Sequence, residues 1–149
     1  MKQLIYIDLD GVIADFISAM NSHPLRKIHP YDEHPDTIPY IFRNLIPIDG
    51  AVDAVKSLLQ SDSYEVYFLS TAPWNNPSAW TDKRLWLEDQ FGELANRKLI
   101  LTHRKDLIKG DILIDDRPNN GADKFQGVWI QFGSQSFPDW KSILIHLNL

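Results

Sequence analysis

The sequence has no cysteine among its 149 residues, so disulfides and thiolate metal sites are excluded. It has no run of 18 apolar residues, which is about the length that a membrane-spanning helix needs. Positive charge is also scarce, and the net charge is −5. Binding the phosphates of duplex nucleic acid needs a basic surface, so we expect no polymeric nucleic acid partner and no membrane. The first residues do not resemble a signal peptide, and we therefore expect a cytoplasmic protein.

What the chain does have is an alternation of apolar segments and helical patterns. Five segments are short and rich in isoleucine, leucine, valine and tyrosine, which is typical of buried parallel strands. These are residues 4–10, 65–70, 98–102, 111–115 and 128–132. Helical patterns begin near Ala51, Asn76 and Trp140. The alternation predicts an α/β fold: one domain over residues 1–149, with a doubly wound, Rossmann-like, five-stranded parallel sheet and helices on both faces.

Residues 21–48 interrupt the alternation, because they contain five of the nine prolines and show no long periodic pattern. We predict a small cap insertion here, at about residues 17–48, directly after the first strand. Ligands of such sheets bind beyond the carboxyl ends of the strands, so the cap can cover a site at that edge. The spacings of its three histidines, His23, His29 and His34, fit no zinc motif, and we expect these side chains to be exposed.

Chemically reactive side chains follow four of the predicted strands. They are Asp8 and Asp10, then Thr71, then Lys105, and last the pair Asp115 and Asp116. Parallel strands share their carboxyl edge, so these groups can converge on one site. Carboxylates in that position suit Mg²⁺, and a lysine with a hydroxyl can neutralise phosphoryl oxygens. The pattern indicates a phosphoryl-transfer site.

The order of these motifs resembles that of the haloacid dehalogenase (HAD)-like phosphohydrolases. Residues 8–16, 47–55 and 71–73 are similar to motifs of one branch, the 5′(3′)-deoxyribonucleotidases. Residues 83–86 resemble the Lys-x-x-Trp helix of that branch, and the placement of Lys105 before the acidic pair resembles its third and fourth motifs. The resemblance is weakest where the family carries a longer helical cap. It implies a Mg²⁺-dependent phosphomonoesterase for a small phosphate ester, above all a (deoxy)nucleoside monophosphate.

The resemblance also implies roles for individual residues. Asp8 would be the nucleophile that forms an aspartyl-phosphate, and Asp10 the general acid and then the general base. Thr71 and Lys105 would contact the phosphoryl group. The metal ligands would come from Asp8, Asp10 (through its main-chain carbonyl), Asp115 and Asp116, with Asp116 favoured over Asp115.

Three further residues are candidates for substrate binding: Phe16, Trp74 and Lys83. Phe16 matches a family residue beside the nucleobase, and Trp74 follows the second motif. Lys83 matches the lysine of the Lys-x-x-Trp helix and is a candidate phosphate contact, although a helix lysine taken alone is more typically exposed.

Two other functions remain open at this point. One is a HAD phosphatase for a non-nucleotide ester. The other is a phospho-acceptor module of the receiver type, which also combines an acidic cluster with a threonine and a lysine. Its acceptor aspartate follows a middle strand, whereas here no aspartate directly follows the second or third strand. The sequence leaves open the oligomeric state, for which a homodimer is one expectation, and the base and sugar preference.

Overall fold

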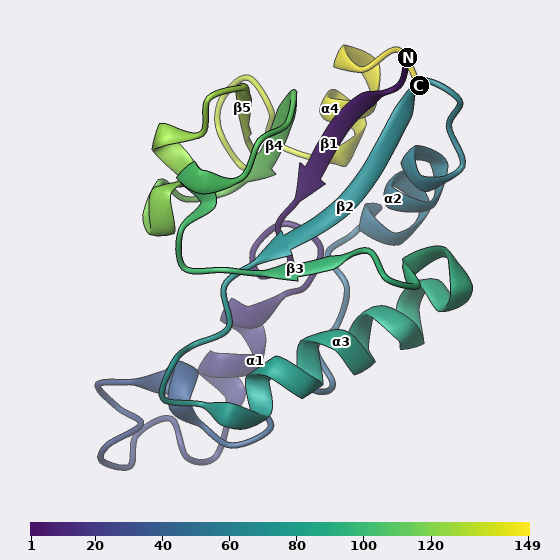
Figure 1. The fold of residues 1–149 in the computed structure, drawn as a ribbon. Coiled ribbons are helices and arrows are strands. Elements are labelled where there is room, and N and C mark those ends of the chain that lie inside the picture. Colours follow the sequence, from purple (N-terminus) through teal and green to yellow (C-terminus); the bar gives the residue numbers. More distant parts are fainter.

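A five-stranded parallel sheet forms the centre of the computed structural model, which describes residues 1–149 (Figure 1). The strands are β1 (Gln3–Ile7), β2 (Tyr64–Ser70), β3 (Leu99–Leu101), β4 (Ile112–Asp115) and β5 (Val128–Gln131). Their spatial order is β3-β2-β1-β4-β5, so the predicted α/β class with a doubly wound sheet is confirmed. Ligands of such sheets bind where the strand order reverses, which here lies between the carboxyl ends of β1 and β4.

The two faces of the sheet are covered by different kinds of helix. The main core lies on one face, under α2 (Ala51–Leu59), α3 (Pro77–Phe91) and α4 (Trp140–His146). A smaller core on the other face lies under two short 3₁₀ helices, η3 (Lys105–Leu107) and η4 (Asn119–Lys124). The connections on this second side, residues 102–111 and 116–127, are too short for long helices. The apolar side chains of each strand therefore divide between a thick and a thin layer.

The first strand ends earlier than predicted. β1 stops at Ile7, whereas we expected a strand as far as Asp10. The backbone N–H groups of residues 12, 13 and 14 all donate to the carbonyl of Leu9, at 3.2, 2.8 and 2.9 Å, and they coil the chain into a tight turn. Gly11 makes this turn with a φ of +78°, which suits a residue without a Cβ. Asp10 therefore lies on the turn, and the alternation of a strand does not set the direction of its side chain.

The segment between this turn and α2 packs beside one end of the sheet. It begins with α1 (Phe16–Ser22), capped by the Asp15 side chain, and continues as turns with one 3₁₀ helix at Pro35–Thr37. Four of its apolar side chains, those of Ile38, Ile41, Phe42 and Leu45, are buried in the main core. We refer to residues 17–48 as the cap.

Helix α3 holds the cap against the sheet. The Trp86 indole N–H donates to the carbonyl of Leu45 at 2.8 Å. At the start of the helix, the Asn76 amide donates to the carbonyls of Asp36 and Ile38, at 2.9 and 3.1 Å. These bonds replace the regular secondary structure that a proline-rich segment cannot form, because buried backbone carbonyls need donors. None of the helices is long and apolar enough to cross a membrane.

Candidate active site

Three carboxylates meet at the carboxyl ends of β1 and β4. The two strands are in register up to Ile7 and Ile114, and Asp8 and Asp115 are the next residues. Asp116 follows along the chain, and carboxylate oxygens from all three aspartates lie within 4.8 Å of one another. Negative charges this close repel each other, so the cluster requires a positive group nearby.

Lys105 supplies part of that positive charge. It begins η3 and is only 3% exposed. Its Nζ atom lies 2.5 Å from Asp115 Oδ2 and 3.2 Å from Asp8 Oδ1. Burial opposes the charged form, but the two carboxylates outweigh burial and raise the pKa of Lys105. One ammonium group cannot balance three carboxylates, and the cluster keeps an excess of acidic groups.

The excess of carboxylates affects the pKa values of the acidic pair, Asp115 and Asp116. Burial, together with repulsion from Asp8, raises the pKa of Asp115 to about 7 and also raises the pKa of Asp116. Protein groups bind both oxygens of Asp115, with Lys105 on Oδ2 and the backbone N–H of Arg117 on Oδ1 at 3.2 Å. In contrast, Asp116 Oδ1 is buried and accepts no hydrogen bond. Asp116 is thus the member of the pair with an oxygen available to a ligand.

Gly11 allows the loop after β1 to approach Asp116 closely. A Cβ atom at this position would collide with the Asp116 carboxylate. A larger residue would displace the Asp116 carboxylate, so both this close contact and the positive φ favour glycine at position 11.

Asp10 is paired with Lys83 on α3. Lys83 is 2% exposed, and its Nζ atom donates to Asp10 Oδ2 and lies 4.4 Å from the centroid of the Phe42 ring. Burial raises the pKa of Asp10, and the neighbouring ammonium acts in the opposite direction. The expectation that a helix lysine would be exposed is wrong here, because the sheet covers one side of α3 and the cap covers another.

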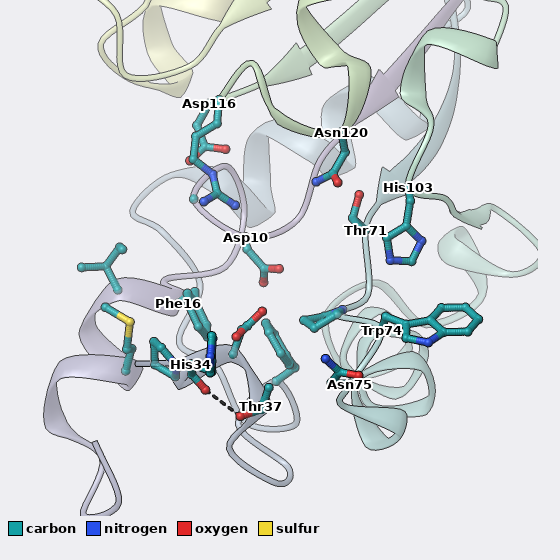
Figure 2. A pocket seen from close by; sticks show the side chains of 18 of the residues that line it. Asp10, Phe16, His34, Thr37, Thr71, Trp74, Asn75, His103, Asp116 and Asn120 are labelled. Atoms are coloured by element: carbon teal, nitrogen blue, oxygen red, sulfur yellow. Dashed lines mark hydrogen bonds and ion pairs between the residues drawn. The ribbon is translucent and has the colours of Figure 1, made fainter. Parts of the chain in front are cut away.

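A cavity of about 900 Å³ lies between the cap and this edge of the sheet (Figure 2). Five of the expected site residues line it: Asp10, Phe16, Thr71, Trp74 and Asp116. The other four do not line the cavity but lie behind the residues that do; they are Asp8, Lys83, Lys105 and Asp115. The structure therefore brings the expected residues into two connected layers, one open and one buried.

Aromatic side chains stand on two sides of the cavity. Phe16 stacks on Phe42 of the cap, with ring centroids 5.0 Å apart and planes 7° from parallel. Trp74 is 76% exposed and meets His103 edge-on, at 6.0 Å between centroids. Sequence reasoning did not single out His103, nor Arg117, which also lines the cavity. Both lie within two residues of a motif residue, and that proximity is the signal that could have identified them.

Thr71 directly follows β2 and lines the cavity near Asn120 (Figure 2). Its Oγ1 atom donates to the carbonyl of Thr102 at 2.7 Å, which joins the loops after β2 and β3. A hydroxyl has one hydrogen, so Thr71 can donate to a ligand only after it releases this carbonyl.

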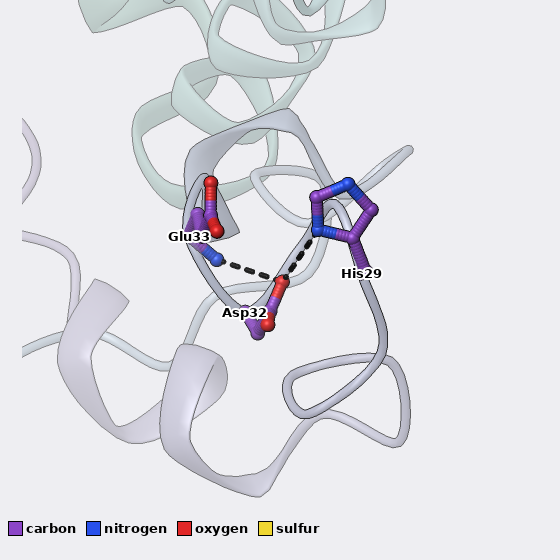
Figure 3. Close-up of side chains that lie close together, drawn as sticks. All are labelled: His29, Asp32 and Glu33. Carbon is purple, nitrogen blue, oxygen red and sulfur yellow. Dashed lines mark hydrogen bonds and ion pairs between the residues drawn. The ribbon is translucent and has the colours of Figure 1, made fainter.

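The cap histidines do not converge. His29 instead lies against Asp32, 3.4 Å from Nδ1 to Oδ1, with Glu33 nearby (Figure 3). All three side chains are exposed, and no buried polar atom faces them. Exposed acidic groups of this kind are common, and this one carries no proposal of a metal site. His34 lies apart from this group and lines the cavity.

Known proteins resemble the chain over most of its length. The family model described as "5' nucleotidase, deoxy (Pyrimidine), cytosolic type C protein" matches residues 25–139. A protein of Vibrio phage KVP40, provisionally named a 5′(3′)-deoxyribonucleotidase, is 44% identical over 147 residues, 99% of this chain and 85% of that protein. The 5′(3′)-deoxyribonucleotidase of Bacillus subtilis is 30% identical over 151 residues, 89% of this chain and 86% of that protein. The chain belongs to the 5′(3′)-deoxyribonucleotidase family.

A solved structure agrees with this assignment at the level of the fold. The Bacillus subtilis protein YfnB, provisionally named a HAD hydrolase and solved bound to magnesium, superposes with a TM-score of 0.64 at 11% identity, covering 99% of each chain. The predicted resemblance to HAD-like deoxyribonucleotidases is confirmed, and so is the enzyme class, a hydrolase of phosphoric monoesters. The receiver-type signalling module is accordingly set aside.

Asp116→Asn should stabilise the fold when divalent cations are absent. The substitution removes one of three clustered negative charges and leaves the shape unchanged. We expect the Tm in EDTA to rise by about 2–4 °C, the shift that roughly 1 kcal/mol produces in a protein of this size. Thermal unfolding of the variant and of the exposed control Asp123→Asn would measure this. An unchanged or lower Tm would show that Asp116 is not under repulsion.

Proposed function

We propose that this member of the family is a Mg²⁺-dependent phosphatase of (deoxy)nucleoside monophosphates that works through an aspartyl-phosphate. The observation that supports this most is the grouping of Asp8, Asp115 and Asp116 around the buried Lys105, beside a cavity of about 900 Å³. That volume is in the range of small-molecule sites, about 300–1,000 Å³.

The side chains fit Mg²⁺ on chemical grounds. All available donors are oxygens, and the cluster has more acidic groups than its one lysine can neutralise. The unbonded Oδ1 of Asp116 is a ready ligand. Asp8, the main-chain carbonyl of Asp10 and Asp116 would hold the ion, while Asp115 holds Lys105. When bound, the ion would supply charge neutralisation for the phosphoryl oxygens.

The proposed chemistry has two steps. The Asp8 carboxylate attacks phosphorus, the bond from phosphorus to the ester oxygen breaks, and Asp10 gives a proton to the leaving alkoxide. Asp10 then removes a proton from a water molecule that attacks the same phosphorus, which releases phosphate and restores Asp8. Lys105 keeps the Asp8 carboxylate oriented in both steps.

A nucleotide fits this cavity better than a phosphate ester without a ring. Trp74 presents a largely exposed aromatic surface, and the Phe16–Phe42 stack forms another apolar wall. Base stacking on aromatic residues is worth about 1–3 kcal/mol in nucleic acid binders. The cap is short and rich in proline, so we expect the cavity to accept several bases with modest selectivity.

The purified enzyme should hydrolyse p-nitrophenyl phosphate with Mg²⁺, lose this activity in EDTA, and regain it when Mg²⁺ is restored. Asp8→Asn should reduce turnover to below a few per cent, because an amide is a poor nucleophile and a weaker ligand. The exposed Asp62→Asn should behave as the wild type. Full activity in EDTA would contradict the metal requirement, and an active Asp8→Asn enzyme would contradict the role of Asp8.

Asp10→Asn should slow alkyl phosphates more than aryl phosphates. General acid catalysis is typically worth about 10²–10⁴-fold, and an aryl leaving group needs less of it. Single-turnover rates with dTMP and p-nitrophenyl phosphate would measure the difference without interference from the second step. Equal losses on both substrates would mean that Asp10 does not protonate the leaving group.

Substrate preference tests the nucleotide proposal separately from the chemistry. We expect kcat/KM for dTMP, dUMP and dGMP to exceed that for glycerol phosphate. Trp74→Ala should lower the nucleotide values about five-fold, the effect of roughly 1 kcal/mol at the lower end of base stacking, and leave glycerol phosphate unchanged. Val128→Ala removes an exposed apolar side chain on β5, away from the cavity, and serves as the control. Equal or higher rates on glycerol phosphate would contradict a nucleotidase.

A further inference from the structure

Lys83 is the most deeply buried charged side chain next to the cavity, and the proposed chemistry gives it no role. It is 2% exposed and forms an ion pair with Asp10 and with no other acidic residue. Burying an ammonium group costs free energy unless its partner is well placed. The fold can therefore bury Lys83 only because the Asp10 carboxylate lies beside it. A lysine required only for the stability of α3 could be replaced by an apolar residue of similar length.

The ion pair occupies one oxygen of Asp10 and leaves the other unbonded. Lys83 donates to Oδ2, and no protein group donates to Oδ1. Asp10 lies on the turn after β1, so no strand geometry holds its side chain. The ammonium group is therefore the group in the structure that fixes which oxygen of Asp10 is free to face the cavity.

The cap shields the lysine of this pair from water, while Asp10 lines the cavity. The Phe42 ring covers Lys83, with Nζ 4.4 Å from its centroid, and Phe42 itself stacks on Phe16. An ion pair removed from water is stronger and better oriented than an exposed one. Phe42 is thus the cap residue that contacts both Phe16, beside the cavity, and Lys83, the partner of Asp10.

We propose that Lys83 is a positioning residue that orients Asp10 for proton transfer to the leaving group, and that it does not bind the substrate phosphate. The inference rests on the proposed phosphatase function. Lys83 holds Oδ2, and Oδ1 carries the proton that passes to the ester oxygen as the bond to phosphorus breaks. Asp10 is then left as a carboxylate, which stays paired with the ammonium group until it accepts a proton from water.

A double-mutant cycle tests this role directly. Lys83→Met keeps the length and apolar body of the side chain and removes the charge. In single-turnover experiments we expect it to slow dTMP hydrolysis by about 10²-fold and to slow p-nitrophenyl phosphate much less, as loss of a general acid does. In an Asp10→Asn background the same change should cost less than about three-fold, because residues that act as a unit are not additive. Lys83→Arg should restore part of the rate.

Lys98→Met is a matched control. Lys98 also lies over an aromatic ring, 4.8 Å from the Tyr67 centroid, but it donates to the carbonyl of Val66 and contacts no catalytic group. We expect no change in the ratio of alkyl to aryl rates in this variant. Lys83→Leu, which also removes the donor to Asp10, replaces Lys83→Met in the cycle if the methionine variant does not fold.

Binding of inorganic phosphate in the presence of Mg²⁺ separates positioning from phosphate contact. Calorimetry should give Lys83→Met an affinity within about three-fold of the wild type, and the kinetic loss should appear in kcat with little change in KM. A large loss of phosphate affinity, equal losses on alkyl and aryl esters, or full additivity with Asp10→Asn would each overturn the proposal. A wild type without phosphatase activity would instead refute the function on which it rests.

Discussion

The site depends on one constraint, the need to hold three aspartates together at the carboxyl ends of two adjacent strands. Asp8 and Asp115 are neighbours because β1 and β4 are paired in register. Asp116 completes the cluster, and its carboxylate fits there because Gly11 has no Cβ. Their mutual repulsion is relieved in part by the buried Lys105. Burial, together with the remaining negative charge, raises the pKa of both Asp115 and Asp116, and the excess of carboxylates favours binding of a cation. The proposed chemistry follows from this imbalance.

A second ion pair lies at the boundary between the sheet and the cap. Lys83 and Asp10 come from α3 and from the turn after β1, and Phe42 of the cap covers them. The same helix supports the cap through Trp86 and Asn76. Helix α3 therefore connects the cap with the residue that would transfer the proton.

The sequence was sufficient to predict the sheet, its class and the convergence of Asp8, Lys105 and Asp115, because parallel strands place their last residues at one edge. It was not sufficient to predict the partner of Lys83. The alternation of polar and apolar residues from Asp8 to Asp10 suggests a longer strand, whereas backbone hydrogen bonds to Leu9 turn the chain at that point. Helix α3 is covered by both the sheet and the cap, so its pattern of apolar residues does not distinguish a buried lysine from an exposed one. That difference depends on tertiary contacts.

The central claim is that Asp8 carries the phosphoryl group during turnover, and chemical trapping tests it most directly. Enzyme mixed with dTMP and Mg²⁺ is quenched in acid during the first turnover and treated with borohydride, which reduces an aspartyl-phosphate to homoserine. Peptide mass spectrometry then locates the change. The account predicts homoserine at position 8 only, and only when substrate is present. Modification at Asp10, Asp115 or Asp116, or no modification while dTMP is consumed, would contradict it.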